Sequence, residues 1–147
     1  MPQYKCLNFK LEELVPRELF AKYGTACWEL FDSNALRTID ELREYFGVSV
    51  TINNWVWGGK LENCGFRTPD YYKEFSRSQH LYGRAFDLHF AGMSAEDVRQ
   101  EIVYRRKFAN KFIHIGGMEL DVDWVHIDTR NTDKGRPESG GIFLFKP

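Results

Sequence analysis

The most regular hydrophobic pattern of the chain lies between residues 33 and 47, where apolar side chains recur every three to four positions. These positions are Leu36, Ile39, Leu42, Tyr45 and Phe46. Such a period predicts an amphipathic helix that buries one face. Asp32, Ser33 and Asn34 offer N-caps for this helix, and Gly47 offers a C-terminal stop.

The chain before this helix carries weaker signals. Residues 4–9 alternate weakly between apolar and polar types, which is consistent with a short edge strand or an arm. A helical pattern follows from about Pro16 to Tyr23, and proline is favoured in the first turn of a helix. We therefore expect one short helix before the longer one.

A further helix is expected in the second half of the chain. The stretch Ser94-Ala-Glu-Asp97 resembles a capping box, and the helical pattern then runs to about Lys107. Val98, Ile102 and the stem of Arg105 are predicted to face the core. The basic residues 105–107 are predicted to form a solvated cluster that complements the helix dipole.

Short runs rich in β-branched and aromatic residues predict strands. These runs are Val48–Ile52, Arg84–Phe90, Phe112–Leu120, Trp124–Thr129 and Gly141–Lys146, the last of which is expected to close the sheet. An acidic turn, residues 119–123, joins the third run to the fourth. The pattern predicts an α+β fold in which helices pack on one face of a mainly antiparallel sheet.

Composition indicates one folded domain spanning residues 1–147. Hydrophobic residues make up 43% of the chain and aromatic residues 16%, which excludes a disordered or fibrous protein. The net charge of −1 argues against nucleic acid or an anionic membrane surface as the main partner. We expect a monomer.

The three cysteines, Cys6, Cys27 and Cys64, are widely spaced and odd in number, as expected of a reduced protein without a disulfide framework. The N-terminus shows no apolar run of signal-peptide length. The chain is therefore expected to stay in the cytoplasm when it is made, and to act elsewhere only after release.

A metal site is predicted around residues 78–90. A gap of seven residues and an intervening glycine, Gly83, place His80 in a loop, whereas strand alternation directs Asp87 out of the sheet beside it. His126 in a later strand offers a third ligand. Three protein ligands that leave one position open are typical of catalytic zinc. Asp128, on the same strand face as His126, is better placed as its hydrogen-bonding partner or as a turn residue than as a ligand.

These residues resemble the M15 peptidases, which include zinc D,D-carboxypeptidases, D,D-dipeptidases and phage L-alanyl-D-glutamate endolysins. The pattern S-x-H-x-x-G-x-A-x-D is met over residues 78–87, and an acid three residues before a histidine followed by x-D is met by Asp123, His126 and Asp128. The resemblance extends from about Val50 to Arg130. It implies one zinc, held by His80, Asp87 and His126.

The resemblance also implies roles for residues outside the metal shell. Asp123 is expected to act as general base, which requires the chain to bend before Trp124, with Glu119 and Asp121 as competitors. Arg67 resembles the upstream arginine of the family, whose planar fork suits an oxyanion or a substrate carboxylate.

Substrate contacts are expected in the irregular stretch of residues 53–79, because ordered loops beside a metal ligand form clefts. Ser78 and Tyr82 are candidates to bind the peptide, with loop capping as the alternative for Ser78. His89 and His114 are read as structural or cleft histidines.

The function that the resemblance implies is zinc-dependent hydrolysis of the stem peptide of bacterial peptidoglycan. Both L-Ala–D-Glu endopeptidase and D,D-carboxypeptidase activity share these motifs. Because no signal peptide is evident, a phage endolysin is favoured over an exported enzyme. The alternatives are an inactive metal-binding module and a phage structural protein with the same fold.

Overall fold

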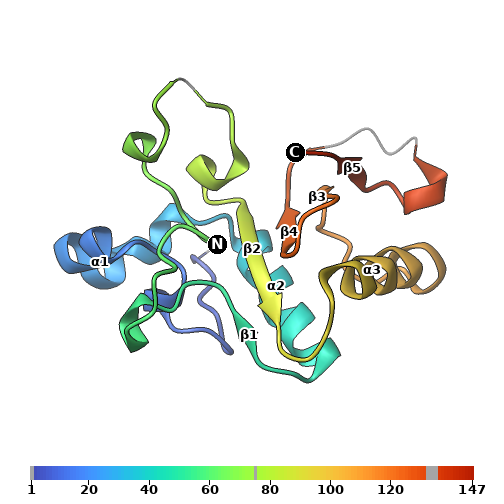
Figure 1. Cartoon of the computed structure of the whole chain (residues 1–147), viewed down its shortest axis with the longest axis horizontal. Coiled ribbons are helices and arrows are strands. Elements are labelled where there is room, and N and C mark those ends of the chain that lie inside the picture. Colours follow the sequence, from blue (N-terminus) through green and yellow to red (C-terminus); the bar gives the residue numbers. More distant parts are fainter. Residues whose placement is uncertain (1, 75, 132–135) are drawn as a thin grey trace.

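The computed structural model describes residues 2–74, 76–131 and 136–147. A five-stranded sheet has the order β1-β2-β4-β3-β5. Its strands are β1 (Val50–Thr51), β2 (Ala85–Phe90), β3 (Gly117–Glu119), β4 (Val125–Asp128) and β5 (Phe143–Phe145). All neighbouring pairs are antiparallel except β3 and β5, which are parallel. The expected α+β class with a mainly antiparallel sheet is confirmed (Figure 1).

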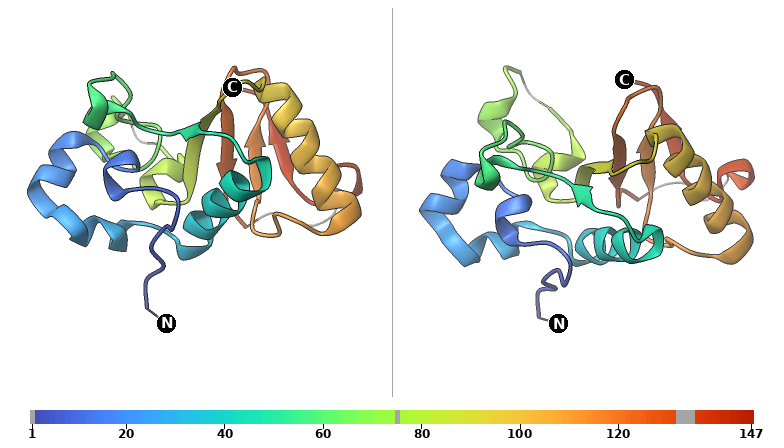
Figure 2. Two further views of the ribbon diagram at one scale, coloured as in Figure 1. Left: turned by 90° about the horizontal axis from the view of Figure 1, so that it is seen from below. Right: turned by 60° about the horizontal axis from the view of Figure 1, so that its bottom comes forward.

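Three α-helices accompany the sheet: α1 (Arg17–Tyr23), α2 (Ser33–Phe46) and α3 (Ala95–Ala109). Asp32 caps α2, because its side chain accepts a hydrogen bond from the backbone of Asn34, and Gly47 ends α2 with φ 65°. Ser94 caps α3 in the same way. Both views in Figure 2 place α1 at the opposite end of the molecule from α3, and α2 lies between them.

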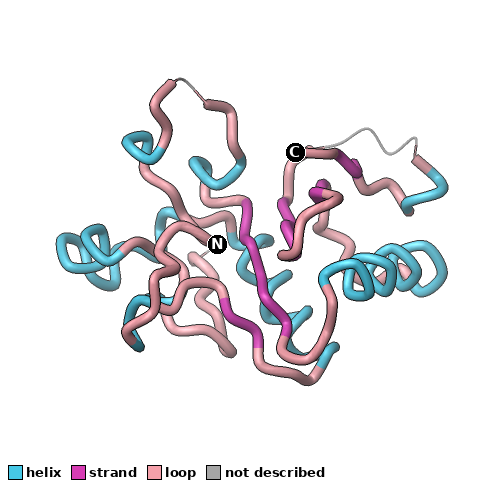
Figure 3. The backbone as a smooth tube through the Cα atoms, in the orientation of Figure 1, coloured by secondary structure: helices cyan, strands magenta, loops and turns pink. Residues whose placement is uncertain are grey.

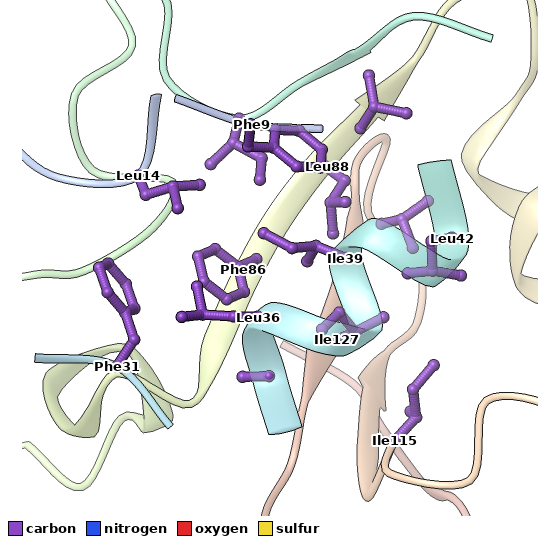
Figure 4. Close-up of a cluster of buried hydrophobic side chains, with 14 of the residues drawn as sticks. Phe9, Leu14, Phe31, Leu36, Ile39, Leu42, Phe86, Leu88, Ile115 and Ile127 are labelled. Atoms are coloured by element: carbon purple, nitrogen blue, oxygen red, sulfur yellow. The ribbon is translucent and has the colours of Figure 1, made fainter. Parts of the chain in front are cut away.

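The core lies between the sheet and the two longer helices, α2 and α3. Cross-strand pairing puts Phe86 opposite Ile127 and Leu88 opposite Val125, so all four share one face. Figure 4 shows that face packed against Leu36, Ile39 and Leu42 of α2. Val98 and Ile102 of α3 belong to the same cluster. Full burial of each such side chain contributes about 1.5–3 kcal/mol, so this face fixes the register of β2 and β4.

The buried arginine of α3 is Arg99 and not Arg105. Arg99 is 5% exposed and donates a hydrogen bond to the Trp124 carbonyl at 3.0 Å. Arg105 lies on the surface, where it pairs with Glu101 at 2.8 Å. Of the predicted solvated cluster, Arg106 is half-buried instead. Its guanidinium donates to the carbonyls of Phe112 and Ile115.

The strand predicted for residues 112–120 is shorter than expected. The helix α3 continues to Ala109, and the chain then turns through Asn110 and Phe112, both with positive φ. The backbone of Phe112 bonds to side chains, since its N–H donates to Glu41 and its carbonyl accepts from Arg106. These groups are therefore not available for a ladder, and β3 begins only at Gly117.

The N-terminal segment is an arm and not a strand. Asp40 on α2 accepts hydrogen bonds from the Tyr4 hydroxyl and from the backbone N–H groups of Leu7 and Asn8, at 2.7, 2.8 and 3.0 Å. A side-chain carboxylate thus replaces the partner strand. Val48–Ile52 also forms less strand than predicted, because only Val50 and Thr51 pair with β2.

Irregular backbone dominates the stretch between β1 and β2 (Figure 3). Among the described residues of 53–78, only two isolated 3₁₀ turns form, Trp55–Trp57 and Pro69–Tyr71, before a third begins at Gln79. Buried Asn53 connects this stretch to the segment just before α1. Its amide donates to the Val15 carbonyl and accepts from the Cys64 N–H. The predicted long loop is therefore present and ordered by specific bonds.

Candidate metal centre

Asp87 and His126 face each other directly across β2 and β4. The alternation that buries Phe86 and Ile127 on one face sends these two side chains to the other. Nδ1 of His126 lies 3.0 Å from Oδ1 of Asp87. Both residues are buried, so the pair forms the floor of a polar cluster on this side of the sheet.

His80 joins this pair from the 3₁₀ helix Gln79–Tyr82. Ser78 caps that helix by accepting a hydrogen bond from the His80 N–H, and Gly83 ends it with φ 66°. A Cβ at Gly83 would also collide with the Leu30 carbonyl oxygen, so this turn requires glycine. Nε2 of the His80 ring lies 3.4 Å from Oδ1 of Asp87.

The backbone of residues 64–66 holds two of the three candidate ligands, Asp87 and His80. The Cys64 carbonyl accepts from the Asp87 N–H at 2.7 Å, and the Gly65 carbonyl lies 2.8 Å from Nδ1 of His80. The Phe66 N–H donates to the Leu14 carbonyl, and a Cβ at Gly65 would strike that same oxygen. Leu14, in the segment before α1, therefore supports the site through residues 64–66, a role that sequence reasoning missed.

Arg67 is bonded to the cluster. One guanidinium nitrogen, Nη2, lies 2.9 Å from Oδ2 of Asp87, and Nη1 donates to the Tyr72 hydroxyl at 3.1 Å. Nε donates to the Asn63 carbonyl, and the group stacks on the Tyr71 ring. The sequence interpretation assigned Arg67 to an oxyanion or a substrate carboxylate, but in the structure it binds the carboxylate of Asp87.

Asp128 forms a hydrogen bond with the second ring nitrogen of His126. Its Oδ2 lies 2.9 Å from Nε2, and both of its oxygens accept hydrogen bonds from Arg130. The predicted placement of Asp128 beside His126 agrees with this geometry. Arg130 carried no sequence signal for such a role, although it lies only two residues after Asp128.

The electrostatics of the cluster favour a positive charge between the carboxylates. Burial alone would raise the pKa of Asp87, but hydrogen bonds from His126 and His80 outweigh it and hold that pKa well below the ordinary value. Burial opposes the charge of His126 too, yet Asp128 and Asp87 raise its pKa to about 9. Burial would raise the pKa of Asp128 as well, but hydrogen bonds from His126 and Arg130 outweigh it and lower that pKa to about 2. A buried site that stabilises a cation in this way suits a metal ion.

The geometry fits one ion. Ligand atoms of His80, Asp87 and His126 all lie within 4.8 Å of one another. Ligands about 2.1 Å from a tetrahedral zinc are separated by about 3.4 Å. Oδ1 of Asp87 lies at similar distances, 3.0 and 3.4 Å, from the facing nitrogens of His126 and His80. The ring nitrogen of each histidine that does not face Asp87 is bonded to Gly65 or Asp128, and this leaves the facing nitrogens free to coordinate. These residues can therefore hold a metal.

Asp123 lies outside this cluster. The chain bends over residues 121–124 before β4 starts at Val125, so the required bend is present. Asp123 is exposed and lines a small pocket of about 120 Å³ with His89 and Met93. In the described part of the chain, no hydrogen bond or ion pair joins it to the three ligands. Its competitor Asp121 is exposed too and pairs with Lys146 at 3.5 Å.

The remaining candidates are placed as follows. Ser78 caps the helix that carries His80, which was the alternative considered for it. Tyr82 is half exposed and lines a pocket of about 300 Å³ that also includes Tyr72 and Leu81. His89 is exposed, and His114 lines a separate pocket near Arg106. Neither histidine belongs to the metal cluster.

Among the described residues, no helix is long and apolar enough to cross a membrane. Comparison with curated proteins and with solved structures gives no match. A family model described as Peptidase M15 does match, over residues 7–128. The match begins far before Val50, where the motif-based resemblance started, and so includes Leu14 and residues 64–66, which support the site. The chain therefore belongs to the M15 peptidase family, whose members are metal-dependent peptidases.

Proposed function

We propose that the protein is a zinc-dependent peptidase that hydrolyses the stem peptide of bacterial peptidoglycan, as a phage endolysin does. The observation that carries the proposal is the His80–Asp87–His126 cluster, in which two histidine nitrogens converge on one carboxylate oxygen. Its donor set of two imidazoles and one carboxylate is that of a zinc site with an open position. The shared motif over residues 78–87 supports the substrate class.

The chemistry divides between the ion and the chain. Zinc, when bound, supplies Lewis acidity and makes water a nucleophile at neutral pH. Asp123 accepts the proton of the attacking water and delivers it to the leaving amine. Arg67 orients Asp87 through their ion pair, and its positive charge also stabilises negative charge that develops on the scissile carbonyl oxygen.

The surroundings of Arg67 support an extended peptide substrate. Tyr71 and Tyr72, adjacent in sequence, both contact Arg67. Tyr72 lines the pocket that contains Tyr82, whereas Tyr71 lines a larger hollow of about 590 Å³ that extends to α1. A stem peptide that crosses Arg67 would fill both pockets, and Tyr82 would contact it. Ser78 acts on the substrate only through the position of His80.

The larger hollow suits a substrate with charges of both signs. It is lined by Arg17, Lys22, Glu18, Glu62 and Asp70 together with apolar and neutral residues. Stem peptides carry free carboxylates, and many also carry an amine on the side chain of a diamino acid. Opposite charges along one wall offer partners for both kinds of group.

The second candidate is a metal-binding module without catalysis, and the exposure of Asp123 favours it. Two measurements separate the candidates: zinc content per chain, and hydrolysis of purified peptidoglycan by the zinc-loaded and the metal-free protein. The proposal expects one zinc per chain and hydrolysis only with zinc. One zinc without hydrolysis would support the second candidate, and no zinc would contradict both.

A further inference from the structure

Arg130 and Asp128 form a bidentate ion pair next to His126 of the metal cluster. Nε of Arg130 donates to Oδ1 of Asp128 at 2.8 Å, and Nη2 donates to Oδ2 at 2.6 Å. The same Oδ2 lies 2.9 Å from Nε2 of His126. Asp128 is fully buried, with 0% of its side chain exposed. Its carboxylate thus links one proposed metal ligand to one arginine.

The C-terminal strand β5 fixes the arginine in turn. The guanidinium of Arg130 lies 4.7 Å from the centre of the Phe145 ring and 5.4 Å from that of Phe143. Phe145 also meets the His126 ring edge-on at 5.5 Å. Stacking on two rings orients the planar fork, which a lysine in the same place cannot reproduce.

The strand β3 leaves space for this pair. Gly117 is paired with Asp128 in the sheet. A Cβ at Gly117 would lie 2.7 Å from Oδ1 of Asp128 and 2.8 Å from Nε of Arg130. Any side chain there would force the carboxylate or the guanidinium to shift. Residues in or just after three neighbouring strands, β3, β4 and β5, therefore build this contact.

We infer that Arg130 is a positioning residue for the metal centre: held by Phe143 and Phe145, it fixes Asp128 so that His126 presents Nδ1 toward Asp87 and His80. The inference rests on the proposed function, because it assumes that His126 binds metal. It adds that the affinity for metal depends on β5, which supplies no ligand. The partners that orient a ligating histidine typically account for about 10- to 100-fold in metal affinity.

The test compares zinc affinity among variants of the full chain, measured by competition with a fluorescent chelator. Arg130→Gln removes the fork, Gly117→Ala disturbs the pair while it keeps Arg130, and Phe145→Leu removes one stacked ring. Arg105→Gln is the matched control. Arg105 also bonds to one carboxylate and stacks on two rings, those of Tyr45 and Tyr104, but it lies on α3.

The variants are expected to differ in their affinity for zinc. Arg130→Gln and Gly117→Ala should each weaken zinc binding by about 10- to 100-fold, and Phe145→Leu by less. Arg130→Lys should remain weakened although it keeps the charge. Excess zinc should restore the activity of Arg130→Gln. Arg105→Gln should bind zinc as the unaltered protein does. Unchanged affinity in Arg130→Gln, or an equal loss in the control, would overturn the inference.

A second measurement, proton exchange at His126, needs no zinc and no change to the ion pair itself. In the metal-free chain, the Nε2 proton of His126 should exchange slowly with water, because Asp128 covers it, and NMR measures that exchange. Phe145→Leu should accelerate it, whereas Arg105→Gln should not. If exchange is equally slow in all variants, Arg130 and β5 do not position the ring. If the unaltered chain binds no zinc, the proposed function fails, and this exchange still decides the positioning role.

Discussion

Oδ1 of Asp87 lies 3.0 Å from Nδ1 of His126, its direct partner across β2 and β4. The same oxygen lies 3.4 Å from Nε2 of His80, which reaches it from a 3₁₀ helix. One carboxylate oxygen thus faces two imidazole nitrogens in a buried setting, an arrangement that a metal ion stabilises.

The double variant His80→Ala, His126→Ala should bind no stoichiometric zinc, because one carboxylate remains of the three ligands. Elemental analysis of the purified protein measures this directly. Zinc at about 100 times its dissociation constant should also stabilise the unaltered chain by about 2.7 kcal/mol and the double variant not at all. One zinc per chain in the double variant would place the site elsewhere.

Arg67→Ala should lower the rate at saturating zinc by about 100-fold, the usual loss when one donor to a developing oxyanion is removed. Because Arg67 bonds to Asp87, zinc affinity should fall as well. Rates measured over a range of zinc concentrations separate the two effects. Arg77→Ala, an exposed arginine in the same loop, is the control and should change neither. Equal rates for both variants would remove Arg67 from the chemistry.

Asp123→Asn should leave zinc affinity nearly intact, because Asp123 is not among the three ligands. The rate should fall by about 10²- to 10⁴-fold if Asp123 moves the proton. Asp121→Asn and Glu119→Gln are the controls, since Asp121 faces solvent and neither belongs to the cluster. Similar rates in all three variants would show that the general base lies in another loop.

Asp40→Ala should destabilise the chain by about 2–4 kcal/mol, because three donors of the N-terminal arm lose their acceptor. Urea denaturation measures the free energy of unfolding. Glu44→Ala on the same helix removes one exposed bond to Asn8 and should cost less than about 1 kcal/mol. An equal effect of both changes would show that the arm is not anchored by Asp40.

Sequence reasoning reached the parts of this site that depend on local pattern. Strand alternation alone sends Asp87 and His126 to the face opposite Phe86 and Ile127, and a glycine turn beside His80 is visible in the chain. The supports of the site were not predictable in this way. Whether Leu14 meets Gly65, or Phe145 meets Arg130, depends on contacts between segments far apart in sequence, for which periodicity carries no information.

The boundaries of the helices and strands were likewise predictable where they depend on local residues, and not where they depend on contacts between distant segments. The C-terminal stop of α2 at Gly47 was predicted to the residue, and its N-cap Asp32 is one of the three candidates that the sequence offered, because caps act locally. The strand predicted from Phe112 begins only at Gly117, since Glu41 and Arg106 on two helices take the backbone groups of Phe112. Side chains from elsewhere in the fold overrode the local preference for strand.

The most direct test of the central claim is mass spectrometry of purified peptidoglycan after incubation with the zinc-loaded chain. The account predicts fragments cut within the stem peptide, their loss after the metal is chelated, and their return when zinc is added back. The masses would also distinguish an L-Ala–D-Glu cut from a D-Ala–D-Ala cut. Intact stem peptides after incubation with a chain that holds one zinc would contradict the account.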